Sequence, residues 1–139
     1  SANQALDRII NFFPEERRSQ LLMDLSLNTR AFVAQRLIPR RDGKGRVPSV
    51  EVMLNSPLIS DLIFKGDVSG IKDIMKRSRE LGMQTFDQSL FDLYEDELIT
   101  YEDALRNADS INDLRLQIKL HSRHGEMDTS GGIKNLGIL

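Results

Sequence analysis

Apolar residues recur with helical spacing along the first part of the chain. One face of a first predicted helix carries them at positions i, i+3, i+4 and i+7, namely Leu6, Ile9, Ile10 and Phe13. Asn3 is the expected N-cap of this helix, and Pro14 ends it because the residue before a proline avoids helical angles. A second helix is predicted from Pro14 to about Ala34, with an apolar stripe formed by Leu21, Leu22, Leu25, Phe32 and Val33.

The hydrophobic period then changes from helical to two residues. Residues 49–54 alternate in the manner of a half-buried strand, with Val50, Val52 and Leu54 on one side and Ser49, Glu51 and Met53 on the other. Leu37 and Ile38 supply a short partner strand across the turn at residues 41–45, which predicts a β-hairpin near residues 35–54. Pro39 and Pro48 cannot donate ladder hydrogen bonds, so both are expected at a strand end or on an outer edge.

Capping residues predict the starts of further short helices. These N-caps are Ser56, Asp67, Thr85, Thr100 and Ser110. Glycines end the first two of these helices, at Gly66 and Gly82. The predicted fold is mainly α with one β-hairpin and spans residues 1–123. Residues 124–139 contain four glycines and no hydrophobic periodicity, so we expect a mobile tail there.

Composition narrows the class of protein. The chain has 139 residues with 40% hydrophobic side chains, which suits one domain with a real core. It has no cysteine, which excludes disulfides, thiolate metal sites and thiol chemistry, and is compatible with a reducing cytoplasm. No apolar run approaches the roughly 20 residues of a membrane span, so we expect a soluble protein without direct membrane insertion.

Charge is unevenly distributed along the chain. Between Glu15 and Arg46 there are eight basic and four acidic residues, whereas between Gln84 and Asp113 nine acids accompany only Arg106. Two solvated faces are the simpler interpretation. The alternative is head-to-tail assembly, in which the basic edge of one subunit meets the acidic edge of the next and a ring closes.

Few residues have the spacing that catalysis or metal binding needs. The phosphate-binding pattern G-x-x-x-x-G-K-[ST] does not occur, and the glycines at 43 and 45 are predicted to form a turn. His121 and His124 are spaced i, i+3 but lack neighbouring carboxylates, so no metal site is predicted. The carboxylates at 95–97 are interpreted as solvated surface.

Three blocks of sequence carry a resemblance to a known family. They are NQALDRIINFFPEERR (3–18), RLIPRRDGKGRVPSVEVMLNSPLISDLIF (36–64) and GMQTFDQSL (82–90). Together they resemble the C-terminal part of the motor domain of type IV pilus retraction ATPases, the PilT/PilU family of the secretion-ATPase superfamily. The sequence of these blocks is more similar to the PilU branch than to the PilT branch.

This resemblance implies a fold and a function. The fold would be the C-terminal helical subdomain of a RecA-like secretion ATPase. The parent protein would be a cytoplasmic hexamer at the inner-membrane base of the pilus, using ATP and Mg to power retraction and twitching motility. Its partners would be a PilT-type motor and the inner-membrane pilus platform. Because the phosphate-binding loop is absent from this chain, we expect the chain alone to bind no cofactor and to be inactive, and to provide oligomer contacts and motion coupling.

The segment 57–64 is similar in position to the family's retraction motif, usually AIRNLIRE. Its residues are Pro57, Leu58, Ile59, Ser60, Asp61, Leu62, Ile63 and Phe64. The apolar positions match, whereas the motif's arginines are missing, which favours an accessory motor over an autonomous one. The apolar stripe of Leu58, Ile59, Leu62 and Ile63 suits either core packing or docking of a partner, and the two alternatives stay open.

Five residues near the hairpin are candidates for nucleotide or subunit contacts. They are Gln35, Arg36, Arg40, Arg41 and Arg46. In ring ATPases, arginines from a neighbouring subunit stabilise charge on the transferred phosphoryl group. The alternative is that these side chains provide solubility or inter-subunit ion pairs.

Two other classes of function remain as alternatives. One is a helical protein-interaction adaptor without ATPase activity, which would bind through the stripe from Leu58 to Ile63. The other is a nucleic-acid binder that uses the basic stretch from Arg17 to Arg46. The acidic second half and the lack of interleaved aromatics argue against the second class, so no nucleic-acid partner is expected.

Overall fold

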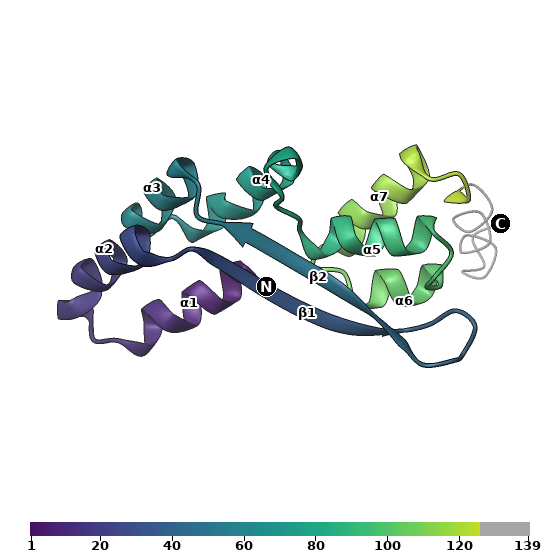
Figure 1. Ribbon diagram of the computed structural model, residues 1–139, viewed down its shortest axis with the longest axis horizontal. Coiled ribbons are helices and arrows are strands. Elements are labelled where there is room, and N and C mark those ends of the chain that lie inside the picture. Colours follow the sequence, from purple (N-terminus) through teal and green to yellow (C-terminus); the bar gives the residue numbers. More distant parts are fainter. Residues whose placement is uncertain (126–139) are drawn as a thin grey trace. The chain divides into compact units, whose positions relative to one another are not determined.

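The computed structural model describes residues 1–125 as a mainly helical protein with one antiparallel β-hairpin (Figure 1). The strands are β1 (Ala31–Pro39) and β2 (Arg46–Leu54). The predicted hairpin is present, but both strands begin earlier and β1 is longer than the short partner expected at Leu37 and Ile38. The chain divides into two compact units, and each takes in part of the hairpin. Unit 1 contains residues 1–35 and 50–85, and unit 2 contains residues 36–49 together with the described residues from 86 onward.

Unit 1 holds four helices and three short 3-10 turns. The helices are α1 (Ala2–Phe12), α2 (Arg18–Asn28), α3 (Pro57–Lys65) and α4 (Ile71–Lys76), and the turns are η1 (Glu15–Arg17), η2 (Val68–Gly70) and η3 (Arg79–Leu81). Its core is built from aliphatic and methionine side chains, among them Leu6, Ile10, Met53, Ile59, Ile63, Ile71, Met75 and Met83.

Unit 2 holds α5 (Phe86–Glu95), α6 (Tyr101–Arg106) and α7 (Ile111–His121). A separate core of Ile38, Leu90, Tyr94, Ile99, Ala104, Leu114 and Ile118 lies among these helices and the adjoining part of the hairpin.

Three helices start at their predicted caps, whereas Asp67 makes no side-chain cap bond at the start of η2. The side chains of Ser56, Thr100 and Ser110 each accept a hydrogen bond from the backbone N–H three residues later. The first helix differs, because its N-cap is Ser1 and not Asn3. Ser1 forms a capping box with Gln4, which satisfies two free helix-end donors at once.

The predicted second helix is too long. It ends at Asn28 and not near Ala34, and β1 begins at Ala31. The side-chain amide of Asn55 donates to the carbonyls of Ser26 and Thr29, at 2.9 Å each, and so stabilises the end of α2. The backbone N–H of Asn55 also donates to the carbonyl of Arg30 at 3.0 Å, which begins strand pairing there. Pairing with a distant strand therefore overrides the local helical pattern.

The helix expected from Asp67 to Leu81 is also divided. It consists of η2, α4 and η3, with Ser78 interrupting before η3. The Ser78 hydroxyl donates to the carbonyl of Ile74 at 2.6 Å, a local bond that competes with helix continuation. Gly82 ends the segment with a φ of 96°, as predicted.

The buried face of β2 is the more polar of its two faces, which hydrophobicity alone would not predict. Ser49, Glu51 and Met53 are buried, whereas Val50, Val52 and Leu54 are only partly buried. Bonds from the N–H of Arg40 to Gly45 and from the N–H of Asn55 to Arg30 fit one antiparallel register without a bulge. In this register the nitrogens of Pro39 and Pro48 point away from the partner strand, which fits their predicted edge positions.

The last turn of α5 is joined to the end of α7 by one carboxylate. Glu95 accepts from the hydroxyl of Ser122 at 2.7 Å, from the backbone N–H of Arg123 at 3.0 Å and from its Nε at 2.9 Å. The Ser122 hydroxyl and the Arg123 backbone N–H are the main groups that lower the pKa of Glu95 from 4.5 to about 2.

The Glu95 contacts predict an acid-dependent loss of stability in unit 2. Because the folded pKa lies below the unfolded one, the contribution of Glu95 is fully present above pH 4.5 and is lost as the pH falls toward about 2. The stability difference between the wild type and Glu95→Gln should therefore shrink as the pH falls through this range. Hydrogen exchange of α7 amides measures it, with the exposed Glu102→Gln as control. A difference that is independent of pH would contradict the prediction.

Candidate functional site

The helix at the retraction-motif position, α3, is defined at both ends by local bonds. The Ser56 hydroxyl accepts from the N–H of Ile59, and Pro57 occupies the first helical position. Gly66 ends the helix with a φ of 72°, a left-handed conformation that strongly favours glycine. The eight candidate residues 57–64 therefore all lie on one ordered helix.

The apolar residues of α3 divide between a buried side and two exposed flanks. Ile59 and Ile63 are fully buried in the core of unit 1, and Leu62 is partly buried. Leu58 and Phe64 have exposed fractions of 62% and 52%. The sequence predicts one apolar stripe that contains both Leu58 and Ile59, but the core of unit 1 is too narrow to cover Leu58 as well. Core packing therefore explains only part of the apolar pattern.

Two polar residues of α3 have defined partners. The Ser60 hydroxyl donates to the carbonyl of Ser26 in α2 at 2.7 Å, which fastens the two helices together. Asp61 forms an ion pair with Lys65 at 2.8 Å, one turn along the helix. This exposed pair is worth little to stability. It lies on the outer side of α3, between Leu58 and Phe64 on the helical wheel.

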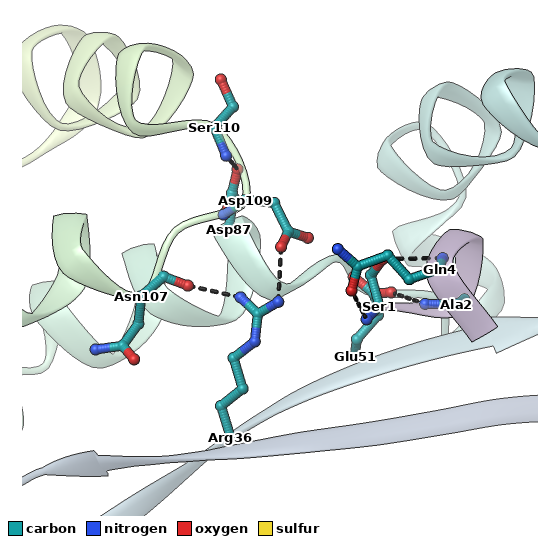
Figure 2. Close-up of polar contacts among 9 residues, drawn as sticks. All are labelled: Ser1, Ala2, Gln4, Arg36, Glu51, Asp87, Asn107, Asp109 and Ser110. Atoms are coloured by element: carbon teal, nitrogen blue, oxygen red, sulfur yellow. Dashed lines mark hydrogen bonds and ion pairs between the residues drawn. The ribbon is translucent and has the colours of Figure 1, made fainter. Parts of the chain in front are cut away.

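Arg36 is the most buried of the candidate arginines, and its guanidinium binds groups inside unit 2. Its Nη1 donates to the carbonyl of Asn107 at 2.6 Å, and its Nη2 lies 2.7 Å from Oδ1 of Asp109. The guanidinium also lies 4.0 Å from the ring centroid of Phe86, a cation–π contact. Figure 2 shows Arg36 pointing from β1 toward Asn107 and Asp109. At least two of its N–H groups are thus directed at protein acceptors.

The loop that receives Arg36 is itself held by a carboxylate. Asp87 accepts from the backbone N–H groups of Asp109 at 2.8 Å and Ser110 at 3.1 Å (Figure 2). These bonds fix the start of α7 and the position of the Asp109 side chain.

The tip of the hairpin is a compact turn, as predicted. Arg40 pairs with Asp42 at 2.8 Å, and Asp42 also accepts from the backbone N–H of Lys44 at 2.8 Å. The Arg40 side chain and then the Lys44 N–H lower the pKa of Asp42. Gly43 and Gly45 have φ values of 73° and 95°, so both serve the turn.

The remaining candidate side chains face outward. Gln35, Arg41 and Arg46 are exposed, and the backbone N–H of Arg41 donates to the carbonyl of Leu98 at 2.8 Å. The five candidates therefore do not converge on one site, since Arg36 lies on the inner face of β1 and Gln35 on its outer face.

The basic and acidic stretches of the sequence are partly paired with each other inside unit 2. The ion pair of Arg36 with Asp109 joins the basic stretch to the acidic one in the same molecule. The backbone bond from Arg41 to Leu98 also brings the hairpin tip to the turn after α5, but it leaves the charged Arg41 side chain exposed. Fewer charges are therefore left for contacts with a second subunit than the sequence alone suggested.

One buried carboxylate, Glu51, was not among the residues predicted from the sequence. It is 1% exposed, and its Oε1 accepts from the backbone N–H of Ala2 at 2.7 Å, as drawn in Figure 2. The bond ties β2 to the first turn of α1 within unit 1. The sequence feature that could have predicted this bond is a single acidic residue between Val50 and Val52, because a charged residue in a buried strand needs a specific partner.

The histidine pair forms no metal site in the part of the chain that the structure describes. Within residues 1–125 there is no group of three or more potential metal ligands. His124 lies 3.8 Å from Glu97 and packs edge-on against Tyr94. Among the same residues no helix is long and apolar enough to cross a membrane. Most of the predicted tail, residues 126–139, lies outside the described residues.

Comparison with known proteins identifies clear relatives. The chain is 63% identical over 122 residues to the type IV pilus ATPase PilU of Pseudomonas aeruginosa, covering 88% of this chain and 32% of PilU. It is 33% identical over 108 residues to the retraction ATPase PilT of the same organism, covering 78% and 31%. A twitching motility protein of Neisseria gonorrhoeae is 35% identical over 107 residues, covering 77% and 29%.

Solved structures agree with these relatives. The crystal structure of the pilus retraction motor PilT with bound ADP matches with a TM-score of 0.70 and 29% identity, over 80% of this chain and 30% of that one. The ATPase DotB of Legionella pneumophila shares the fold, with a TM-score of 0.60 and 18% identity over 75% and 28%. No family model matches the chain.

The chain spans about a third of the length of the curated relatives that it matches. The high identity to PilU extends over most of this chain, and the PilT motor matches in both sequence and structure. The chain therefore belongs to the PilT/PilU family of type IV pilus ATPases, in the secretion-ATPase superfamily, and corresponds to the C-terminal part of the motor domain.

Proposed function

We propose that the protein containing this chain is a cytoplasmic hexameric ATPase that powers type IV pilus retraction and twitching motility from the inner-membrane base of the pilus. In this proposal ATP and Mg are bound mainly by parts of the motor outside these residues, because the sequence has no phosphate-binding loop. The chain contributes oligomer contacts and couples motion to a PilT-type motor and to the pilus platform. The likeness to PilU and PilT supports this function.

The single observation that carries the coupling role is the two-sided α3 helix. Ile59 and Ile63 anchor it in the core of unit 1, while Leu58 and Phe64 are exposed on other sides. Burying a leucine or phenylalanine side chain gains about 1.5–3 kcal/mol, so two such exposed side chains favour contact with another surface. A helix fixed on one side and apolar on another can transmit a displacement of its partner to the core.

An open strand edge gives further support. In the hairpin register, the backbone groups of Val33 and Gln35 point away from β2 and have no backbone partner among residues 1–125. An unprotected edge beside an exposed valine is unusual for a protein surface that stays in water. The rest of the motor would cover this edge.

The exposed arginines fit subunit contacts better than nucleotide chemistry. Arg41 and Arg46 are exposed, and Arg40 is already paired with Asp42. Arg36 is held inside unit 2 and would act by fixing the hairpin that presents the others. We therefore assign Gln35, Arg41 and Arg46 to contacts between subunits.

The proposal predicts that the isolated chain does not hydrolyse ATP. The 139 residues lack the loop that holds the β- and γ-phosphates, so no turnover above the buffer rate is expected. A coupled phosphate-release assay measures this, with the parent protein as the positive control. Turnover that stays with the chain through repeated purification would contradict the prediction. An inactive parent would instead favour the adaptor without ATPase activity.

A second prediction concerns the outer side of α3 in the parent protein. The double variant Leu58→Ser and Phe64→Ser should retain its fold, because exposed positions usually change stability by less than about 0.5 kcal/mol. Assembly or twitching should fall at least about fivefold, since the loss of interface anchors costs more than about 1 kcal/mol. Light scattering and a twitching-zone assay measure the two effects.

Leu81→Ser is the matched control, because Leu81 is an equally exposed leucine elsewhere in unit 1. The control should assemble and support twitching as the wild type does. If the α3 double variant also behaves as the wild type, α3 does not carry the contact.

A further inference from the structure

The tip of the hairpin contains the only Asp-Gly pair of the chain, Asp42 with Gly43, and the chain has no Asn-Gly pair. Residues 39–46 are all exposed. An aspartate that precedes glycine is especially prone to isomerisation, because glycine has no Cβ atom to hinder attack by its backbone nitrogen on the aspartate side chain. By sequence and exposure, this peptide bond is the place in the chain most open to that modification.

Isomerisation needs a free nitrogen and a free carboxyl group. The backbone nitrogen of Gly43 loses its proton and bonds to Cγ of Asp42, while the protonated carboxyl group releases its hydroxyl as water. The product is a five-membered cyclic imide. Water then breaks the bond between this nitrogen and the original backbone carbonyl carbon, so that the main chain runs through Cβ and Cγ as an isoaspartate. One water is released and one is taken up, and no oxidant or reductant takes part.

Both reacting groups are engaged in the folded tip, and Arg40 contacts both. The Asp42 carboxylate accepts from Nε of Arg40 at 3.2 Å and from its Nη2 at 2.8 Å. It also accepts from the backbone N–H of Lys44 at 2.8 Å. The backbone N–H of Gly43 donates to the carbonyl of Arg40 at 3.0 Å. The nitrogen and the carboxylate are therefore each held by a bond that the reaction must break.

The charge of Arg40 acts in the same direction as these bonds. Its side chain is the first cause of the lowered pKa of Asp42. An ionised carboxylate repels a nucleophile and has no hydroxyl that can leave as water, so a lowered pKa disfavours the imide. The two side chains are 42% and 43% exposed, and such a pair contributes little to stability. Its effect falls instead on the chemistry of the turn.

We propose that Arg40 protects the peptide bond between Asp42 and Gly43 from isomerisation. An isoaspartate at residue 42 would add one carbon atom to the main chain of the tip. The turn is closed by the bond from the N–H of Arg40 to the carbonyl of Gly45 at 2.9 Å, which spans the site of this insertion. Isomerisation would therefore alter the turn that presents Arg41 and Arg46. This inference does not rest on the proposed motor function.

The test is the rate of isoaspartate formation in the full 139-residue chain at physiological pH and temperature. Protein isoaspartyl methyltransferase labels the product, and mass spectrometry of digested peptides assigns it to residue 42. The free peptide of residues 39–46 is the unprotected reference. The wild-type chain should isomerise at least about tenfold more slowly than this peptide, because several hydrogen bonds must first break.

The variant Arg40→Gln should isomerise about threefold faster than the wild type, the factor expected when one exposed ion pair is lost. Arg41→Gln is the matched control, because it removes the same charge from the next exposed residue of the tip and should leave the rate unchanged. Both positions are exposed, so the fold should persist. A wild-type chain that isomerises as fast as the peptide would overturn the proposal. Equal rates for Arg40→Gln and the wild type, or for Arg40→Gln and Arg41→Gln, would overturn it as well.

Discussion

The guanidinium of Arg36 is the contact on which the arrangement of unit 2 depends. It binds the loop at Asn107 and Asp109 and stacks on Phe86 at the start of α5, so one side chain joins β1 to two segments more than 45 residues away in sequence. Asp87 holds the same loop through its backbone. Removing one partner of this partly buried pair leaves the other charge without its main partner, which destabilises unit 2.

The same principle operates in unit 1 with the opposite charge. Glu51 is buried and binds the first turn of α1 through the N–H of Ala2. The inner face of the hairpin thus holds helices by polar contacts as well as by packing of Met53 and Ile38. This explains why the buried face of β2 contains a serine and a glutamate, whereas its valines are only partly buried.

Features with local causes could be predicted from the sequence. The caps at Ser56, Thr100 and Ser110 need only residues within one helical turn, and the hairpin turn needs only its glycines. The start of β1 could not be predicted, because it depends on pairing between Arg30 and Asn55. The role of Arg36 depends on a partner 73 residues away, which one sequence does not reveal.

The surfaces predicted from the sequence are subject to the same limit, because local sequence does not show which residues the core covers. Periodicity identified α3 as an amphipathic helix, but a stripe of four apolar residues does not show how wide the core is. Leu58 therefore appeared to belong with Ile59, and the exposed position of Phe64 had no signal of its own. The basic stretch likewise suggested a shared site, whereas Arg36 and Gln35 lie on opposite faces of β1.

Arg36 is a structural contact of unit 2, which leaves function to the exposed surfaces. A double-mutant cycle of Arg36→Met and Asp109→Asn, read from hydrogen exchange of α7 amides, tests it most directly. We predict a coupling free energy of about 1–3 kcal/mol, because the two groups interact at 2.7 Å in a partly buried site. Additivity within about 0.5 kcal/mol would contradict the claim.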